Sequence, residues 1–312
     1  MASPKREPKL RVRASGLKGS GYILPTRNDM IVPGITTVTA VIGDGKGLQQ
    51  WVANNTAAFA VANLDALMNR TELQGYGLLR FYHTRMKPEK FDDPEIDIRD
   101  YSNGVLNDLA DLGTLIHEWI EDHVWGNFEP ELVRDEQVQM AEVFMEWASQ
   151  HTIEPVISET TVIGRSSRGQ MYAGTLDHIW ILDGVPTLVD VKSSRASYEG
   201  HYAQLAALGA AESMLVEVDP ETEGAGMHEN KQTGEVTFWQ EQPLPPFKEY
   251  AILRVRPDDF DNDGNPIPAY CRLEKASDEK IAAAWESFEG ALQQRHGEKQ
   301  FNAVVKKEKE AK

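Results

Sequence analysis

The feature that most constrains the fold is a hairpin signal in residues 174–194, GTLDHIWILDGVPTLVDVKSS. Two runs of β-branched and apolar residues flank the dipeptide Asp183-Gly184. A two-residue type I′ turn needs positive φ at both central positions, which Asp and Gly tolerate. With this turn as the loop, the register places Asp177 directly opposite Asp190, with Cβ atoms about 5 Å apart. The segment therefore predicts an antiparallel hairpin with two facing aspartates.

The charged residues of this hairpin need compensation, because the rest of both faces is apolar. Two facing carboxylates repel one another and lose hydration when they are buried. Lys192 follows Asp190 by two positions and shares its face. A divalent cation between Asp177 and Asp190 would remove the repulsion more completely, and hard oxygen ligands suit magnesium or manganese. The alternative is a plain salt bridge between Lys192 and one aspartate. Beside such ions, the pKa of the lysine should be lowered.

Two further residues are candidates for the same site. His117 in GTLIHEWIEDHV lies at the border of the buried stripe of a helix expected over residues 104–125, where it either packs or reaches a metal. Gln204 in HYAQLAALG lies in the first helix after the Lys192 strand. An amide at that position could bind a phosphate or an active-site water.

The order of elements predicts an α/β fold, with a mixed central β-sheet flanked by helices and a helical N-terminal half. Residues 1–20 carry six basic residues against one acid and are expected to be a flexible basic arm. Residues 21–300 are expected to be a single domain, with a helical part over 35–150 and a sheet core over 151–300, followed by a charged tail over 301–312. The expected helices are 48–70, 72–86, 104–125, 134–150, 197–218 and 278–296. The expected strands are 154–166, 170–182, 185–193, 236–242, 248–257 and 268–276. Residues 217–236 are expected to form a surface loop.

Composition excludes several classes of protein. The single cysteine, Cys271, rules out an internal disulfide, a four-cysteine zinc site and an iron–sulfur cluster held by four thiolates of this chain. A net charge of −17 argues against a protein that coats nucleic acid non-specifically, but not against an enzyme that holds a short stretch of backbone in one cleft. No apolar run long enough for a membrane span and no secretory signal are visible, so a cytoplasmic protein is expected.

Two short motifs are interpreted as turns rather than as ligand sites. GDGKG at residues 43–47 lacks the strand context and the ending of a nucleotide-binding loop. DFDNDG at residues 259–264 matches half of a calcium loop, but Tyr270 stands where the bidentate glutamate should be. We expect a turn between helices at the first and a hydrated hairpin loop at the second.

Four motifs, GTLIH, GTLD, DVK and YAQLAAL, resemble in order and spacing those of the PD-(D/E)XK nucleases, specifically the RecB-like exonuclease branch. The resemblance covers about residues 30–295, although only the four motifs are specific. The chain departs from the branch at Leu208, which replaces the tyrosine of its QxxxY motif, and it lacks the cysteines that bind an iron–sulfur cluster in several relatives.

The resemblance implies a role for each matching residue. Lys192, Asp177 and Asp190 would be catalytic; His117, Asp177, Asp190 and the Val191 carbonyl would bind one or two Mg²⁺ or Mn²⁺ ions; Gln204 and Tyr202 would contact the substrate; and Glu159 would be an accessory acid.

The function implied is a metal-dependent deoxyribonuclease, most naturally a DNA exonuclease of phage or bacterial replication or recombination. Such an enzyme acts on DNA in the cytoplasm of a bacterium or an infected host and does not bind a membrane. Whether it has replication or recombination partners, and whether it forms a homo-oligomer, stays open. Two alternatives remain: a non-catalytic nucleic-acid-binding or scaffold protein on the same fold, and a structure-specific endonuclease.

Overall fold

The structure is a computed structural model that describes residues 10–12, 21–42, 46–65, 68, 101–127, 131–230, 233–261 and 264–310. The chain divides into two compact units, one of residues 1–43 with 115–312 and one of residues 44–114. Helix α2 (Lys46–Ala62) and the first part of α5 (Tyr101–Trp125) belong to the smaller unit. All sites described below lie in the larger unit.

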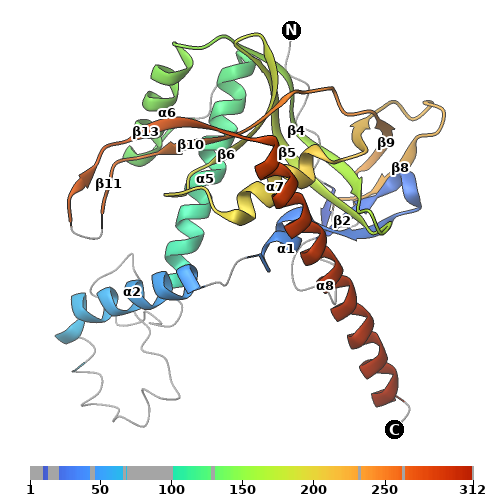
Figure 1. The fold of residues 1–312 in the computed structure, drawn as a ribbon, viewed down its shortest axis with the longest axis horizontal. Helices are drawn as coiled ribbons and strands as arrows, with labels where there is room; N and C mark the ends of the chain where they lie inside the picture. Colours follow the sequence, from blue (N-terminus) through green and yellow to red (C-terminus); the bar gives the residue numbers. More distant parts are fainter. Residues whose placement is uncertain are drawn as a thin grey trace. The chain divides into compact units, whose positions relative to one another are not determined.

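The larger unit is built on an eight-stranded sheet with the strand order β13-β10-β6-β5-β4-β7-β9-β8 (Figure 1). Strands β6 and β10 run parallel, and every other neighbouring pair is antiparallel. The predicted α/β class with a mixed, helix-flanked sheet is confirmed. The strands are β4 (Ile153–Arg165), β5 (Met171–Leu182), β6 (Val185–Lys192), β7 (Ser213–Glu217), β8 (Gly226–Glu229), β9 (Val236–Gln242), β10 (Glu249–Arg256) and β13 (Tyr270–Ala276).

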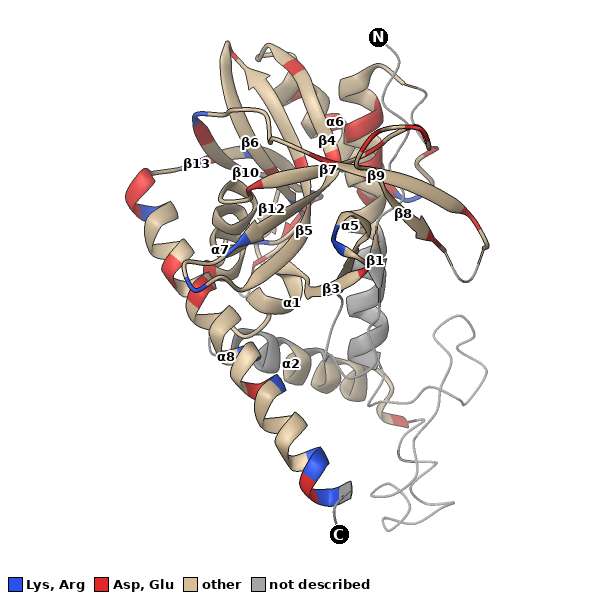
Figure 2. Cartoon of the chain, turned by 90° about the vertical axis from the view of Figure 1, so that its right-hand side faces the viewer, with Lys and Arg blue, Asp and Glu red and all other residues tan. Residues whose placement is uncertain are grey.

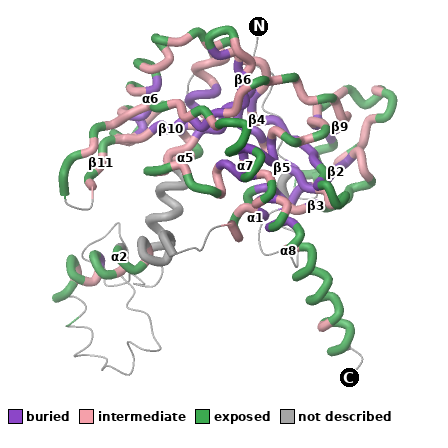
Figure 3. Tube along the Cα trace, viewed as in Figure 1, coloured by how far each residue is buried: buried purple, intermediate pink, exposed green. Residues whose placement is uncertain are grey.

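Different elements cover the two faces of this sheet. On one face, α1 (Ile35–Thr39), α7 (Glu199–Gly209) and α8 (Asp278–Glu310) build an apolar cluster, which includes Leu176 and Leu188. Gly174 lies under α1, where a Cβ would come within 2.5 Å of Ile35 Cδ1, so the glycine of the GTLD motif permits close packing. Figure 3 shows the buried residues concentrated along the central strands.

A small sheet of β1 (Arg11–Val12), β2 (Gly21–Leu24) and β3 (Met30–Pro33) packs on a second cluster, which includes Ala173. Since Ala173 adjoins Gly174 in the strand, this cluster lies on the opposite face. A short 3-10 helix, η1 (Pro25–Arg27), links β2 to β3, and β1 lies within the segment expected to be a flexible arm. Helix α6 (Asp135–Ala148) contacts β10 and β13.

Two predicted elements are wrong. The helix expected over 197–218 ends at Gly209, because residues Ser213–Glu217 pair with β4 and β9 as strand β7. The loop expected over 217–236 contains β8, which pairs with β9 at the sheet edge. In both places hydrogen bonding to strands distant in sequence decides the conformation. A local sequence pattern contains no information about such pairing.

Other expected elements are confirmed or lie outside the described residues. DFDNDG begins the predicted hairpin, with β11 (Asp259–Phe260) paired to β12 (Pro266–Ile267). The expected helix 72–86 lies outside the described residues, as do residues 43–45 of GDGKG. None of the helices in the described part of the chain combines the length and apolar character needed to cross a membrane.

Candidate metal centre and active site

The turn that sets the register of the β5–β6 hairpin is the predicted one. Asp183 and Gly184 have φ angles of 50° and 82°, the left-handed pair that a type I′ turn requires. Five pairs follow, from Leu182 opposite Val185 to His178 opposite Val189, so the predicted register is confirmed. The recorded ladder ends there, one position before the two aspartates.

The hairpin becomes irregular at Asp177. Leu176 and Ile179 pack in the same core cluster although three positions separate them, so the strict alternation predicted for this strand is wrong here. Beyond the ladder, the backbone N–H of Val191 donates a hydrogen bond to Asp177 Oδ2 at 2.8 Å. This contact anchors one carboxylate oxygen of Asp177 to β6. The role of the Val191 carbonyl as a metal ligand stays a prediction.

Asp177 belongs to a group of three residues that could hold a metal ion, with His117 from α5 and Glu159 from β4. One ligand atom of each lies within 4.8 Å of the other two, and His117 Nδ1 is 3.6 Å from Asp177 Oδ2. Asp177 is buried, whereas His117 and Glu159 are half-buried. An imidazole and two carboxylates form a donor set that suits a divalent cation.

Glu159 reaches this group through an irregularity in β4. In the β4–β5 ladder, Ser158 pairs with His178 and Thr160 with Leu176, which places Glu159 opposite Asp177. Its φ of 46° lies in the left-handed region, which a non-glycine residue rarely adopts. The sequence pointed to Glu159 only as an accessory, because a strand pattern carries no sign of such a backbone.

His117 is held in place by the packing and hydrogen bonding of α5. Ile116 and Ile120 are fully buried, as the helical stripe predicted. Two turns beyond His117, Trp125 Nε1 donates to Ser158 Oγ at 2.9 Å, and that hydroxyl lies 2.9 Å from His178 Nδ1. Burial lowers the pKa of His178 to about 3, so this ring is neutral. The chain of contacts ties α5 to the residues that adjoin Glu159 and Asp177.

Asp190 lies outside the three-residue group and has two partners of its own. Lys192 Nζ is 2.6 Å from its Oδ2, and Gln204 Nε2 donates to its Oδ1 at 3.2 Å. The salt bridge foreseen as the alternative to a metal therefore exists for Asp190, while Asp177 joins His117 and Glu159. Gln204 of α7 thus contacts Asp190 of β6, a predicted catalytic residue.

The charges of this region favour a cation. Burial raises the pKa of Asp190 to about 6, despite the opposing effect of Lys192. Burial lowers the pKa of Lys192, but Asp190, Asp177 and Glu159 outweigh it, so the pKa is raised overall. The three carboxylates explain the shift of Lys192, whereas burial is the main cause of the shift of Asp190 and the charge of Asp177 adds to it. The lowered lysine pKa expected beside bound metal ions stays a prediction, because the raised pKa belongs to the protein without an ion.

Tyr202 has other partners in the structure, and Cys271 is a half-buried free thiol. The Tyr202 hydroxyl donates to Glu274 at 3.5 Å, and Lys280 Nζ lies 3.5 Å from the centre of its ring. Burial raises the pKa of the Cys271 thiol to about 12, which makes it a poor nucleophile and metal ligand. The predicted substrate contact of Tyr202 stays a prediction.

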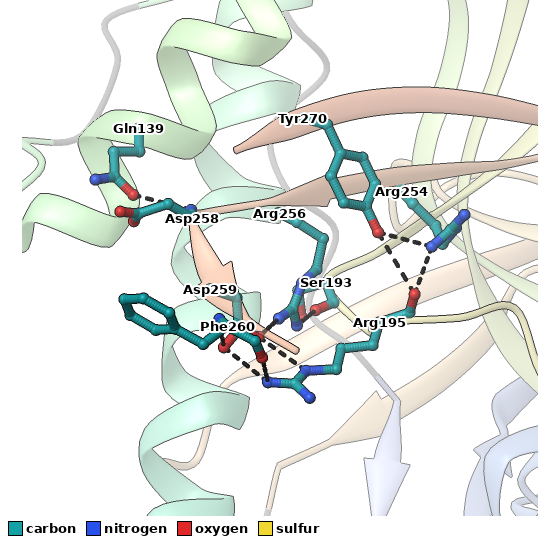
Figure 4. A network of polar contacts seen from close by, with 9 residues as sticks. All are labelled: Gln139, Ser193, Arg195, Arg254, Arg256, Asp258, Asp259, Phe260 and Tyr270. Carbon is teal, nitrogen blue, oxygen red and sulfur yellow. Dashed lines mark hydrogen bonds and ion pairs between the residues drawn. The ribbon is translucent and has the colours of Figure 1, made fainter. Parts of the chain in front are cut away.

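The segment that follows Lys192 is held by a set of ion pairs that we call the arginine network, defined as Arg195, Arg254, Arg256, Asp259 and Glu274. Arg254 donates to the backbone carbonyl of Arg195 at 2.6 Å, and its Nε donates to Glu274 at 2.8 Å. Arg256 donates to the carbonyl of Ser193 at 2.6 Å. Figure 4 shows both arginines of β10 directed at this segment.

The two acids of the network, Asp259 and Glu274, join its arginines to one another and to Ser197. Arg195 donates to both oxygens of Asp259, at 2.8 and 2.7 Å, and Arg256 donates to one of them at 2.6 Å (Figure 4). Glu274 accepts a hydrogen bond from Ser197 at 2.6 Å. The network therefore fixes the segment between Lys192 and α7. Lys192 and Gln204 of α7 are the two residues whose side chains bind Asp190. Sequence reasoning missed it, and the arginines at alternate positions of ILRVR were the available signal.

A scan of protein-family models found no match to this chain, and a search of curated proteins found no similar sequence.

Proposed function

We propose that this protein is a Mg²⁺- or Mn²⁺-dependent deoxyribonuclease of the RecB-like branch of the PD-(D/E)XK nucleases, acting as a DNA exonuclease in phage or bacterial replication or recombination. The observation that carries the proposal is the convergence of His117, Glu159 and Asp177 beside the Asp190–Lys192 pair. These residues come from four separate elements, and four of the five were expected from the motifs to serve one site.

The chemistry of phosphodiester hydrolysis matches these residues. A bound divalent ion would lower the pKa of the attacking water and neutralise charge on the phosphate. His117, Glu159 and Asp177 would hold that ion, and the hydrogen bond from Val191 keeps Asp177 aimed at the group.

The second part of the site supplies a positive charge. Lys192, held at 2.6 Å from Asp190, would stabilise charge that develops on the phosphate oxygens or orient the water. Gln204 keeps Asp190 in place from the other side.

The experiment that tests this proposal is digestion of end-labelled linear DNA with Mg²⁺, with Mn²⁺ or with EDTA. We expect cleavage only with a divalent ion, and a loss of about a thousandfold or more in Asp177→Asn and Lys192→Ala. Asp183→Asn is the matched control, because it makes the same change at the turn of the same hairpin.

The outcomes separate the candidate functions. Cleavage by Lys192→Ala at the wild-type rate would reject the proposed active site. Calorimetry that shows tight binding of Mn²⁺ without cleavage of any DNA would support the non-catalytic alternative. Cleavage of circular DNA as fast as linear DNA would support the endonuclease.

A further inference from the structure

A second site lies at the far end of the strands that carry Glu159 and Asp177. The turn between β4 and β5, together with β3 and the C-terminal half of α8, lines an open cavity of about 860 Å³. Cavities that bind small ligands have volumes of about 300–1,000 Å³. We call this cavity the basic groove, because Arg165, Arg168, Arg295 and Lys299 line it.

The groove gathers positive charge in a chain whose net charge is −17. Arg165 and Arg168 come from the β4–β5 turn region, and Arg295 and Lys299 come from α8. Among the described residues that line the groove, Glu298 is the acidic one. Figure 2 shows Lys and Arg residues together with Asp and Glu residues along the C-terminal part of α8.

The positions of these cations differ. Arg165, Arg168 and Lys299 are all exposed, and Arg165 Nε lies 3.6 Å from Glu212 Oε1. Arg168 and Lys299 are thus presented to solvent at the groove, where an anion can reach them.

Apolar side chains lie among these cations. Phe301 on α8 is 69 % exposed, and Met30 and Ile31 on β3 are 47 % and 45 % exposed. Exposed aromatic and thioether groups beside guanidinium groups suit a ligand that is both anionic and flat. A single strand of nucleic acid is such a ligand, because its phosphates pair with cations while its bases stack on aromatic rings.

The position of the groove relates it to the candidate active site. Strand β5 runs from Met171, which lines the groove, to Asp177, a distance of about 20 Å at the usual rise of a strand. Strand β4 runs from Glu159 to Arg165 over the same number of residues. The β4–β5 hairpin therefore connects the two sites.

We propose that the basic groove binds a single-stranded segment of DNA, at a distance from the scissile phosphate. This inference rests on the proposed function for the choice of DNA as ligand. An acidic peptide would satisfy the cations as well, but it would leave Phe301 without a stacking partner, so the mixture of cations and exposed apolar groups favours the nucleic acid.

The test is binding of a fluorescein-labelled twelve-residue oligothymidylate, measured by anisotropy in EDTA so that cleavage does not contribute. We expect Arg168→Glu/Lys299→Glu to bind at least tenfold more weakly than wild type. The slope of log affinity against log salt should fall by about 1.4, because about 0.7 is lost for each phosphate contact in a single strand. Lys307→Glu/Lys309→Glu is the matched control, with the same charge change on exposed positions further along α8, and it should bind within about twofold of wild type.

A second variant tests the stacking contact. Phe301→Ala should weaken binding by about fivefold or more with an unchanged salt slope, since stacking is not electrostatic. An unaltered affinity in both groove variants would overturn the proposal, as would equal competition by a decameric polyglutamate peptide.

The two proposals fail separately. If wild-type protein cleaves no DNA but the groove variants lose oligonucleotide binding, the nuclease is rejected and the groove stands. If DNA is cleaved and the groove variants bind like wild type, the groove is rejected and the nuclease stands.

Discussion

The candidate metal centre and the arginine network flank the same end of β6, yet their charges are balanced in opposite ways. Around the metal centre, Lys192 is a single ammonium among three carboxylates, and the pKa of Asp190 is raised to about 6. In the network, burial also acts to raise the pKa values of Asp259 and Glu274, but hydrogen bonds from arginines and Ser197 overcome it and both are lowered.

This difference separates a candidate binding site from a structural support. The network contains the counter-charges that its acids need, so it stabilises the fold without any ligand. The metal centre has more acids than bases, and a cation would complete it. We therefore take an excess of carboxylates that share one environment as the better indicator of a candidate ion site in this molecule.

The largest expected contrast concerns stability. Arg254→Met should lower the free energy of unfolding by about 3 kcal/mol, because it removes the cation that pairs with Glu274 and the guanidinium that donates to the carbonyl of Arg195. Glu159→Gln removes one of the excess carboxylates. It should lower the free energy of unfolding by less than about 1 kcal/mol, or should raise it. Urea unfolding of both variants checks this, and equal losses would remove the distinction between the two regions.

The next contrast concerns divalent ions. Wild-type protein should be stabilised by about 2.7 kcal/mol at a Mn²⁺ concentration one hundred times the Kd, because the ion binds only the folded state. Asp177→Asn should lose this stabilisation, whereas Arg256→Lys, in the network, should keep it. Thermal unfolding with and without Mn²⁺ measures the effect, and an ion-dependent increase retained by Asp177→Asn would place the ion elsewhere.

The smallest contrast concerns acid. The folded-state pKa of Glu274 is lowered, so its stabilising contribution is present above the unfolded-state pKa, near 4.5, and is lost as the pH falls through the folded value. Glu274→Gln should therefore show a shallower decline of stability below pH 4.5 than wild type does. Denaturant unfolding across pH 3 to 6 checks it; parallel curves for the two proteins would contradict it.

Local chemistry explains why part of the site was predictable. The Asp183-Gly184 turn sets the β5–β6 register through its own backbone preferences, so the positions of Asp177 and Asp190 along the hairpin followed from the sequence. The helical spacing of apolar residues likewise put His117 at the border of a buried stripe, and the structure leaves it half-buried.

The remaining parts depend on contacts that no local pattern contains. Glu159 joins His117 and Asp177 through a left-handed residue within β4, and strand β7 replaces a predicted helix because it pairs with β4 and β9. Glu274 and the carbonyl of Arg195, both bound by Arg254, lie 20 and 59 positions away from it in the chain.

The sequence by itself determined the α/β class, the hairpin and the residue types available for a metal site, since these follow from periodicity, turn geometry and charge. The tertiary structure decided how the two aspartates are used. It placed Asp177 with His117 and Glu159, and Asp190 with Lys192 and Gln204. The reason is physical: a buried carboxylate takes whichever partners the packing of distant elements brings within reach, and this packing is settled by the whole core.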